Sequence, residues 1–213
     1  MRHTRATVMR TALRLLDEVG LDGLTTRRLA QELDVQSPAL YRHFGSKREL
    51  LDHMAAAMVE DAFAHLARPG PGQDWSGWLA ERGRALRRSL LACRDGARLH
   101  IGTRPVGNQV AISNSVIEVL GEAGFPPADA RRAVLVISRY TVGWVVEEQA
   151  NADRPAPGES REEADADADA DFEYGLSAIL AGLRANLADV RANPADVRAG
   201  PDDVRASPDG EAR

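Results

Sequence analysis

The sequence predicts an all-α protein, with an N-terminal module of three short helices and a larger helical domain behind it. Apolar residues recur at intervals of three and four along most of the chain, which is the spacing of one helix face. No stretch shows the period of two that is typical of a strand. The chain has 213 residues, which is enough for one small module and one larger domain with a substantial core.

Residues 1–46 are predicted to form three helices packed as one module. The first runs from about Thr4 to Val19, and the second begins after Thr25, a favourable N-cap. A third helix follows, with Ser37 as its cap and Pro38 at its first position, where a missing N–H costs little. The buried faces are predicted to consist of Val8, Ala12, Leu15, Leu16, Val19, Leu29, Ala30, Leu33, Leu40 and Phe44.

The outward face of the third helix has the chemistry of a surface that contacts DNA. It offers small groups, an amide, an aromatic hydroxyl, a guanidinium and an imidazole, which suit a major groove and its flanking phosphates. These groups belong to Gln36, Ser37, Ala39, Tyr41, Arg42 and His43. The alternative is a helical hairpin with an ordinary solvated face, which most such hairpins are. The neighbouring elements favour a helix-turn-helix.

The residues around the third helix support this interpretation. Gly45 ends the helix, and Ser46–Glu49 has the sequence of a capping box that opens a fourth helix, about Lys47–Leu66. Lys47 would lie at a helix N-terminus, where the helix dipole and the ammonium both favour a phosphate. Arg27, at the start of the second helix, is placed for a flanking backbone contact.

Charge is unevenly distributed along the chain, and the distribution favours a DNA-binding N-terminus. The formal net charge is −5. Residues 1–50 hold nine Arg or Lys and six Asp or Glu, so this part carries +3 and the remainder carries −8. Attraction to phosphate is screened beyond ~10 Å, so the charge of the module itself decides how it meets DNA. The acidic remainder is expected to stay away from the duplex.

Several further helices are predicted for the larger domain. A break rich in proline and glycine, Arg68–Gly72, follows the fourth helix. Apolar periodicity then predicts helices over Trp75–Ala92, Gly96–His100, Asn108–Ala123, Ala128–Gln149 and Phe172–Leu187.

Two segments are predicted to lack a fixed structure. Residues 151–171 contain two prolines and an alternation of Ala and Asp, so repelling carboxylates and little apolar area predict a mobile loop. Residues 188–213 contain a repeat that begins with Asp-Val-Arg and has a proline in every copy. Proline once in every two turns breaks a helix, and we therefore expect a disordered tail.

Composition and motifs exclude several classes of protein. No apolar run approaches the ~20 residues that cross a bilayer, and no signal segment opens the chain. Cys93 is the only cysteine, which excludes an intramolecular disulfide and a multi-thiolate metal site. Paired catalytic carboxylates, a Ser/His/Asp grouping and a glycine-rich phosphate loop are all absent from the sequence. We expect a cytoplasmic protein without membrane contact that is not an enzyme.

The segment Gly23–Lys47 resembles the DNA-binding module of the tetracycline-repressor (TetR) family of bacterial regulators. The similarity continues beyond this module, where most of the family diverges. It includes Leu90–Pro105 (LLACRDGARLHIGTRP), Tyr140–Gln149 and the last helix from Phe172. Apart from the two flexible breaks, the resemblance covers roughly Thr4–Leu187.

The resemblance implies a homodimer bound to double-stranded DNA, with residues 47–187 as the ligand-binding and dimerisation domain. Two recognition helices would lie about one DNA turn apart, ~34–36 Å, on a palindromic operator. The implied DNA contacts are Thr26, Arg27, Gln36, Ser37, Pro38, Ala39, Tyr41, Arg42, His43 and Lys47. Ser37, Ala39 and Arg42 replace a glutamine, a threonine and a tryptophan of the family's prototype, so a different base preference is expected.

The resemblance also implies a small-molecule inducer in each protomer, which in the prototype is a drug–magnesium chelate. The positions implied on the magnesium side and at the hinge are His100, Thr103, Arg104, Pro105 and Glu147. Those implied on the drug side are Phe63, Arg82, Leu86, Val116 and Arg139. A neutral imidazole can ligate a divalent ion, so His100 is a metal ligand if the inducer is a magnesium chelate. No intrinsic cofactor is expected, and Mg²⁺ only together with a chelating ligand.

The drug-side positions differ from those of the prototype, and a different inducer is therefore expected. The lost amide side chains would each have supplied a hydrogen bond worth about 1 kcal/mol net. Three of the replacements are apolar, while Arg82 or Arg139 would suit an acidic or phenolate oxygen. We predict a repressor that is released from its operator by a small planar molecule, apolar or anionic, of the antibiotic or polyketide type. The alternatives are a repressor that responds to tetracycline with magnesium, and an orphan regulator controlled by a protein partner. A cavity too small for a drug would favour the orphan regulator.

Overall fold

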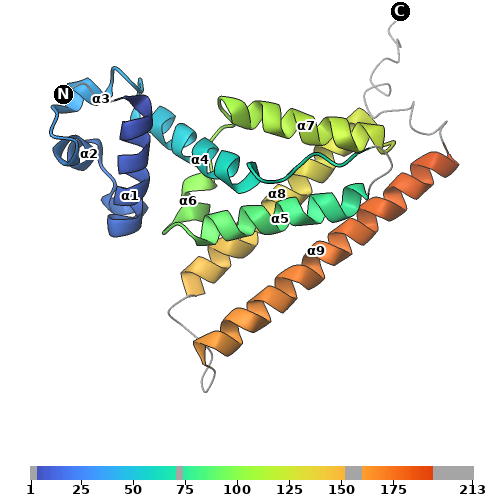
Figure 1. Ribbon diagram of the computed structural model, residues 1–213. Coiled ribbons are helices and arrows are strands. Elements are labelled where there is room, and N and C mark those ends of the chain that lie inside the picture. Colours follow the sequence, from blue (N-terminus) through green and yellow to red (C-terminus); the bar gives the residue numbers. More distant parts are fainter. Residues whose placement is uncertain (1–3, 71–73, 152–159, 194–213) are drawn as a thin grey trace, which may run out of the picture.

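The computed structural model describes residues 4–70, 74–151 and 160–193. Within these ranges the protein has nine helices and no strand. The helices are α1 (Arg5–Gly23), α2 (Thr26–Glu32), α3 (Ser37–Leu40), α4 (Lys47–Phe63), α5 (Trp75–Leu91), α6 (Gly96–His100), α7 (Asn108–Glu122), α8 (Pro127–Asn151) and α9 (Arg161–Ala192). The predicted fold class, a three-helix N-terminal module before a larger helical domain, is confirmed (Figure 1).

The helices α1, α2 and α3 form a lobe at one end of the molecule, and α4 leads from this lobe into the larger domain (Figure 1). Thr4 and Thr25 cap α1 and α2, because each side-chain oxygen accepts a hydrogen bond from an N–H in the first turn. The predicted apolar faces meet inside the lobe, where the side chains exposed by 5% or less include Val8, Ala12, Leu15, Leu16, Leu29, Ala30, Leu33, Leu40 and Phe44.

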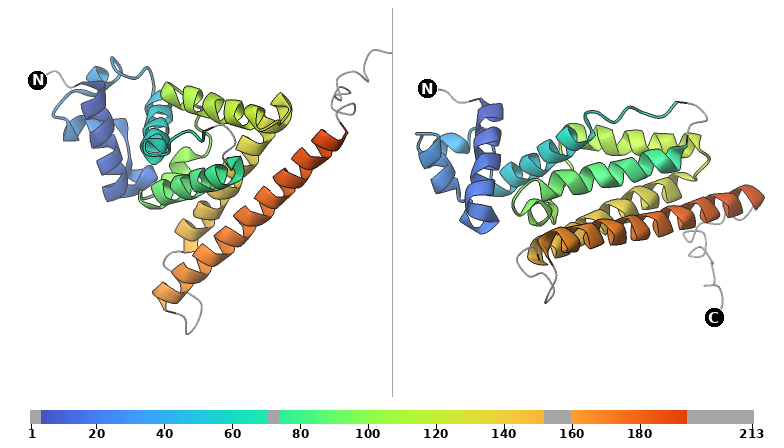
Figure 2. Two further views of the ribbon diagram at one scale, coloured as in Figure 1. Left: turned by 45° about the vertical axis from the view of Figure 1, so that its right-hand side comes forward. Right: turned by 60° about the horizontal axis from the view of Figure 1, so that its bottom comes forward.

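The larger domain is arranged around α8, which packs against α5, α6, α7 and α9. The long helix α9 runs along one side of α5 and α8, and α7 lies on the other side of the domain (Figure 2). A core between these helices contains Leu120, Phe125, Ile137, Phe172 and Leu176. Among the helices that the structure describes, none is long and apolar enough to cross a membrane.

A second core joins the N-terminal lobe to the larger domain. Leu86 and Leu90 of α5, Leu99 of α6 and Val145 of α8 belong to the same buried cluster as the interior of α1–α4. The predicted boundary between residues 46 and 47 coincides with the start of α4. Apolar packing nevertheless continues across that boundary, so the two parts share one interior.

The first and third helices differ in detail from the prediction. The element α1 extends to Gly23, but Gly20 has non-helical backbone angles (φ 72°, ψ 174°), so the helix is kinked directly after the predicted end at Val19. A Cβ atom at Gly20 would lie 2.8 Å from a carboxylate oxygen of Asp95, so both the backbone and its neighbour require glycine. The helix α3 is short, and its N-cap is Gln36 rather than Ser37, with no side-chain cap hydrogen bond.

The prediction of a mobile loop over residues 151–171 is wrong for the part that the structure describes. Asn151 ends α8, and α9 begins at Arg161. Ser160 and Glu163 form a capping box, in which each side chain accepts a hydrogen bond from the backbone N–H of the other residue. The alternating alanines have the highest helix propensity, and acidic side chains near an N-terminus favour the helix dipole. Residues 152–159 lie outside the described residues.

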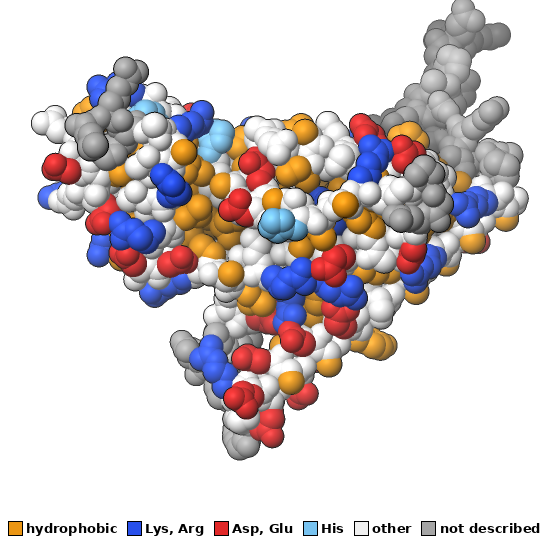
Figure 3. Space-filling model, in the orientation of Figure 1, with side chains coloured by type: hydrophobic (Ala, Val, Ile, Leu, Met, Phe, Trp, Pro, Cys, Tyr) orange, Lys and Arg blue, Asp and Glu red, His pale blue; other side chains and the backbone are white. Residues whose placement is uncertain are grey.

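The carboxylates at the start of α9 gather at a tip of the molecule away from the N-terminal lobe (Figure 3). One of them, Asp169, pairs with Arg87 of α5 at 2.5 Å. At the other end, residues 188–192 are helical and are not part of a disordered tail. Arg191 donates a hydrogen bond to the carbonyl of Ala123 at 2.6 Å, which holds the end of α9 on the turn before α8. The prolines of the repeat lie outside the described residues.

Candidate DNA-binding surface and ligand cavity

The turn between α2 and α3 holds the two helices in a helix-turn-helix. Asp34 is left-handed (φ 50°), a conformation that aspartate tolerates better than most residues. The N–H of Val35 then donates to the carbonyl of Ala30 at 3.0 Å and closes the turn. Because Leu40 and Phe44 are buried, the opposite side of α3 and of the turn after it faces solvent.

The residues predicted to contact DNA lie on α2, on α3 and its flanking turns, and at the first residue of α4. Most are exposed, and the others are half-buried. The exposed side chains are Arg27, Gln36, Pro38, Tyr41, Arg42 and Lys47, and the half-buried ones are Thr26, Ser37, Ala39 and His43. Tyr41 is 49% exposed, a large fraction for an aromatic residue beside a core. This exposure leaves the predicted contacts free to meet a groove.

The cations of the predicted contact surface have no carboxylate partner among the described residues. In the part of the chain that the structure describes, Arg27, Arg42 and Lys47 form no ion pair with a carboxylate. Arg5 and Arg14 of α1, by contrast, pair with glutamates of the protein. Cations without a carboxylate partner leave the predicted contact surface with positive charge, which attracts phosphates.

The start of α4 places Lys47 beside α3. Ser46 accepts a hydrogen bond from the N–H of Glu49 at 3.1 Å, as the predicted capping box requires. The carboxylate of Glu49 accepts its bond from the N–H of Gly45 at 2.7 Å, one residue earlier than the capping box predicts. The two bonds fix the turn that ends the helix-turn-helix and begins α4.

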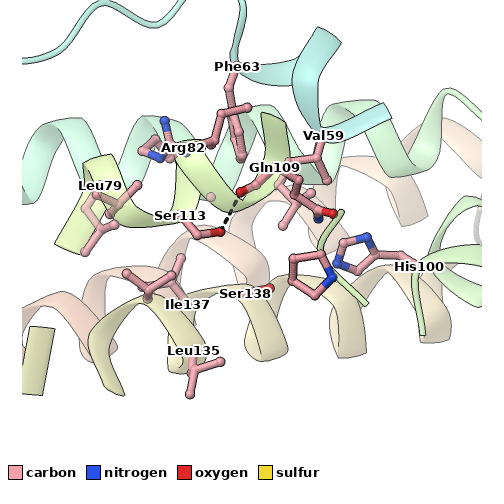
Figure 4. Close-up of a pocket in the computed structure, with 16 residues that line it drawn as sticks. Val59, Phe63, Leu79, Arg82, His100, Gln109, Ser113, Leu135, Ile137 and Ser138 are labelled. Atoms are coloured by element: carbon pink, nitrogen blue, oxygen red, sulfur yellow. Dashed lines mark hydrogen bonds between the residues drawn. The ribbon is translucent and has the colours of Figure 1, made fainter. Parts of the chain in front are cut away.

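A cavity of about 180 Å³ lies within the larger domain, with walls from α4, α5, α7, α8 and the segment between α6 and α7. Most of the wall is apolar, and it includes Val59, Leu79 and Ile137. Figure 4 shows Arg82 beside Phe63 at one side of the cavity and His100 at another. An apolar cavity with a few convergent polar groups is the usual form of a small-molecule site.

The structure places part of the predicted ligand set in this cavity. The wall includes Phe63, Arg82, Leu86, His100, Pro105 and Val116. Four predicted residues do not line it: Thr103, Arg104, Arg139 and Glu147. The Thr103 hydroxyl donates to the carbonyl of His100 at 2.8 Å, and the Arg104 N–H donates to Asp52. Arg139 and Glu147 are exposed on α8. These four residues lie outside the cavity wall, and their contact with a ligand stays a prediction.

Several wall residues were missed by the sequence interpretation. On α7 they are Gln109, Ile112 and Ser113, and on α8 they are Val134, Leu135, Ile137 and Ser138. The α7 residues precede Val116 by seven, four and three positions, so they share its helix face. That spacing was visible in the sequence and would have identified them once Val116 was chosen.

Arg82 has an unusual environment for a charged side chain. It is only 8% exposed, and its guanidinium carbon lies 3.9 Å from the ring centre of Phe63 and 5.0 Å from that of Trp78. Among the described residues it has no carboxylate or hydrogen-bond partner. Burial lowers the pKa of Arg82 to about 10, so the side chain is still a cation at neutral pH. The cavity wall therefore carries a buried positive charge.

His100 is the other titratable group in the wall. Its Nδ1 atom is buried and has no hydrogen-bond partner. Burial lowers the pKa of His100, which keeps the imidazole neutral and able to act as a ligand. Within the described ranges no group of three or more His, Cys, Asp or Glu side chains could hold a metal ion. His100 thus fits a metal only where an organic ligand and water supply the other donor atoms.

The segment between α6 and α7 connects the cavity with the helix that carries the DNA module. His100, the last residue of α6, and Pro105 of this segment line the cavity. Arg48 of α4 donates to the carbonyl of Gly102 at 3.1 Å, and the carboxylate of Asp52 accepts from the N–H of Arg104 at 3.0 Å. Movement of the cavity wall would therefore pull directly on α4.

A second connection joins α6 to the end of α1. The carboxylate of Asp95 accepts a hydrogen bond from the N–H of Leu21 at 2.8 Å, and Arg98 pairs with Asp22 at 3.1 Å. Burial opposes ionisation of Asp95, but the Leu21 N–H and the Arg98 guanidinium more than compensate and hold its pKa below the usual range. These contacts fix the lobe to the same short helix that ends at the cavity.

Comparison with known protein families identifies both parts of this arrangement. Residues 8–54 match the family model "Bacterial regulatory proteins, tetR family", and residues 68–166 match "Tetracyclin repressor-like, C-terminal domain". The chain belongs to the TetR family. It is therefore a DNA-binding regulator of transcription, with the helix-turn-helix of α2 and α3 as its DNA-binding element.

Curated TetR relatives are similar over most of their length. The tetracycline repressor protein class A from transposon 1721 of Escherichia coli is 51% identical over 144 residues, which are 68% of this chain and 66% of that protein. The class C tetracycline repressor of Escherichia coli is 49% identical over 156 residues, which are 73% of this chain and 71% of that protein.

Solved structures of TetR proteins share the whole fold. A single-substitution variant of TetR from Acinetobacter baumannii AYE, in complex with minocycline, has a TM-score of 0.75 and 42% identity, over 85% of this chain and 97% of that one. The class A TetR with 5a,6-anhydrotetracycline and magnesium has a TM-score of 0.67 and 43% identity, over 84% of this chain and 96% of that one. BioQ with its double-stranded DNA operator has a TM-score of 0.66 and 30% identity, over 86% of this chain and 99% of that one.

Proposed function

We propose that this TetR-family regulator is a repressor that binds a palindromic operator as a homodimer and leaves it when a small molecule occupies the cavity. The observation that carries the proposal is a pair of hydrogen bonds between α4 and the segment that follows α6: Arg48 donates to the carbonyl of Gly102, and Asp52 accepts from the N–H of Arg104. Because α4 also begins at the DNA-binding surface, a change in the cavity wall and a change in the position of the module are mechanically linked.

Exposed apolar side chains on α8, beside half-buried ones on α9, support a homodimer. Leu135 and Val136 of α8 are 43% and 40% exposed, a large fraction for aliphatic residues in a helix of the larger domain. A surface groove between the two helices is lined by Val136, Ile179 and Leu183, among others. A second copy of the chain would bury this area, and a twofold dimer presents two α3 helices to half-sites ~34–36 Å apart.

Ligand binding would act by a shift between two arrangements of the dimer. A ligand that fits the cavity only when the segment 101–107 has moved would favour an arrangement in which the two modules no longer match successive major grooves. A coupling free energy of about 1–3 kcal/mol is enough to weaken operator affinity about fivefold to a hundredfold.

The wall of the cavity favours a planar molecule that is mostly apolar or anionic. Phe63, Leu86 and Val116 supply apolar contacts, and Arg82 supplies the only buried cation of the described wall. Tetracycline with magnesium is the alternative that two similar structures suggest, since they hold minocycline, or 5a,6-anhydrotetracycline with magnesium. We do not favour it here, because the residues on the drug side differ and His100 is the only metal-ligating side chain in the wall.

The size of the cavity favours a second candidate, an orphan regulator controlled by a protein partner. The volume of about 180 Å³ is below the ~300–1,000 Å³ that is usual for sites of drug-sized ligands. A ligand of drug size would enter only after the wall had moved outward. Catalysis is not part of either proposal, and the relatives are regulators of transcription.

Two measurements test the proposal. Selection of DNA from a random pool by the purified protein should yield a palindrome, with an affinity that falls as salt rises with a slope of about −0.9 per phosphate contacted. A screen of small molecules by thermal shift should then find a compound that raises the melting temperature and releases the selected DNA. Selection of no sequence would refute the operator, and a screen without any hit would favour the orphan regulator.

A calorimetric titration decides between the ligand classes. Tetracycline with magnesium is expected to bind weakly, and substitution of His100 is expected to change little. Tight binding that depends on both magnesium and His100 would show that the tetracycline alternative is correct.

A further inference from the structure

Arg82 lines the cavity, and its guanidinium lies beside two aromatic rings. The guanidinium carbon lies 3.9 Å from the ring centre of Phe63 and 5.0 Å from that of Trp78, which is the range of a cation–π contact. The N–H donors of a guanidinium point outward in its plane. In the described residues no acceptor of the protein receives them. The site therefore offers a fork of N–H donors that has no acceptor among the described residues.

Another arginine of the same helix shows what such a group binds when the protein supplies the partner. The side chain of Arg87 is 12% exposed, and its guanidinium carbon lies 4.8 Å from the ring centre of Phe172. Unlike Arg82, it is paired with the carboxylates of Glu148 and Asp169. Both arginines are buried beside aromatic rings, but among the described residues only Arg87 has a carboxylate partner. A buried cation without a partner is costly, so a partner from outside the chain is the natural complement.

We propose that Arg82 selects inducers that carry a carboxylate on an aromatic ring system, with the guanidinium edge binding both carboxylate oxygens. Planar two-point binding of this kind is the strongest contact that a single arginine makes with an anion. The apolar wall, which includes Leu79, Val116 and Ile137, would hold the ring, and the volume of about 180 Å³ limits it to one or two fused rings. The inference rests on the proposed function, because it names the ligand class of the same cavity.

Matched pairs of probes test this preference directly. The full-length protein is titrated by calorimetry with 2-naphthoate and with 2-naphthamide, and with salicylate and salicylamide. Within each pair the ring is the same, and the carboxylate is replaced by a neutral amide. At least one carboxylate should bind about tenfold to a hundredfold more tightly than its amide, since charge-assisted hydrogen bonds are the strong ones. If no carboxylate exceeds its amide, including the case in which no probe binds, the inference is wrong.

Variants show whether Arg82 causes the preference. In Arg82→Gln the carboxylate and its amide should bind equally, and in Arg82→Lys the preference should be intermediate because the charge remains without the fork. The matched control is Arg131→Gln, which removes an exposed arginine of α8 that does not line the cavity. A preference that survives in Arg82→Gln, or that is lost in Arg131→Gln, would overturn the assignment. A merely structural role for Arg82 would lower stability and leave the ratio between carboxylate and amide unchanged.

Operator release separates this inference from the proposed function. Carboxylate binding is measured without DNA, and release is measured with the operator selected by the purified protein. Binding that depends on Arg82 but does not weaken the operator complex would support the anion site and refute ligand-controlled release. Release of the operator by a neutral compound, with no preference for carboxylates, would support ligand-controlled release and refute the anion site.

Discussion

Arg82 illustrates how strongly the surroundings of one side chain determine its effect. The sequence identified this position through resemblance and suggested an acidic partner for it. It could not show that Phe63 and Trp78 both lie against the guanidinium, because the contact with Phe63 joins α4 to α5. Nor could it show that the charge is buried without a carboxylate.

Replacing Arg82 by methionine should stabilise the ligand-free protein. The substitution keeps an unbranched side chain and removes a buried charge, and such exchanges raise the free energy of unfolding by about 1–3 kcal/mol. Urea unfolding followed by circular dichroism measures the change. Arg139→Met on the exposed face of α8 is the control and should shift stability by less than about 0.5 kcal/mol. A destabilised Arg82→Met protein would mean that stacking outweighs the cost of burial.

Burial of His100 should make stability depend on pH. Its pKa in the folded protein lies below the ordinary value of 6.5, so the unfolded chain takes up a proton first as the pH falls. The stabilising contribution is therefore complete above about pH 6.5 and is lost as the pH falls through the lower folded pKa. Unfolding free energies at about pH 7.5 and about pH 5.5 should differ less in His100→Asn than in the wild type. The exposed His65→Asn protein should keep the wild-type difference.

At the scale of elements, the boundaries of most helices followed from caps and apolar spacing. The start of α9 did not, because the repeated carboxylates of residues 165–171 were interpreted as a source of repulsion alone. The alanines between them, the capping box and the pairing of Asp169 with Arg87 favour the helix together. Of these, the contact with Arg87 is invisible in the sequence, since it depends on how α5 and α9 pack.

Removing the cap of α9 should loosen its first turns. Ser160→Ala deletes the hydroxyl that accepts from the N–H of Glu163, a loss worth about 1 kcal/mol. Hydrogen exchange of the amides over residues 161–167 should become faster, while exchange near Phe172 stays unchanged because that residue is fully buried. The control is Asp165→Asn, an exposed change inside the helix. Equal exchange in Ser160→Ala and wild type would show that the capping box contributes nothing.

At the scale of the whole molecule, the sequence predicted the fold and the position of the helix-turn-helix, while the cavity was only partly predicted. The wall comes from helices that are far apart in the chain. The sequence therefore identified only those wall residues that match ligand contacts of the TetR family. Thr103 and Arg104, which were also chosen by resemblance, lie outside the wall: the Thr103 hydroxyl donates to the carbonyl of His100, and the Arg104 N–H donates to Asp52 of α4.

A charge placed on the exposed apolar face of α8 should separate the proposed dimer. Val136→Glu would bury a carboxylate against the partner copy, so the dimer dissociation constant should rise by at least about a hundredfold. Analytical ultracentrifugation measures that constant, and operator affinity should fall with it. Val110→Glu alters a residue of α7 that is 44% exposed and outside the groove between α8 and α9, and this variant should remain dimeric. A dimeric Val136→Glu protein would place the interface elsewhere.

The continuous interior that α1–α4 share with Leu86, Leu99 and Val145 has a consequence for building chimaeras. If residues 1–46 were grafted onto the ligand-binding domain of another regulator, these buried faces would pack against different side chains and leave a poorly packed core. The outward side chains of Gln36, Tyr41 and Arg42 are exposed, so they can be exchanged without repacking. Retargeting this regulator to a new promoter is therefore better attempted by recoding those few positions than by transplanting the lobe.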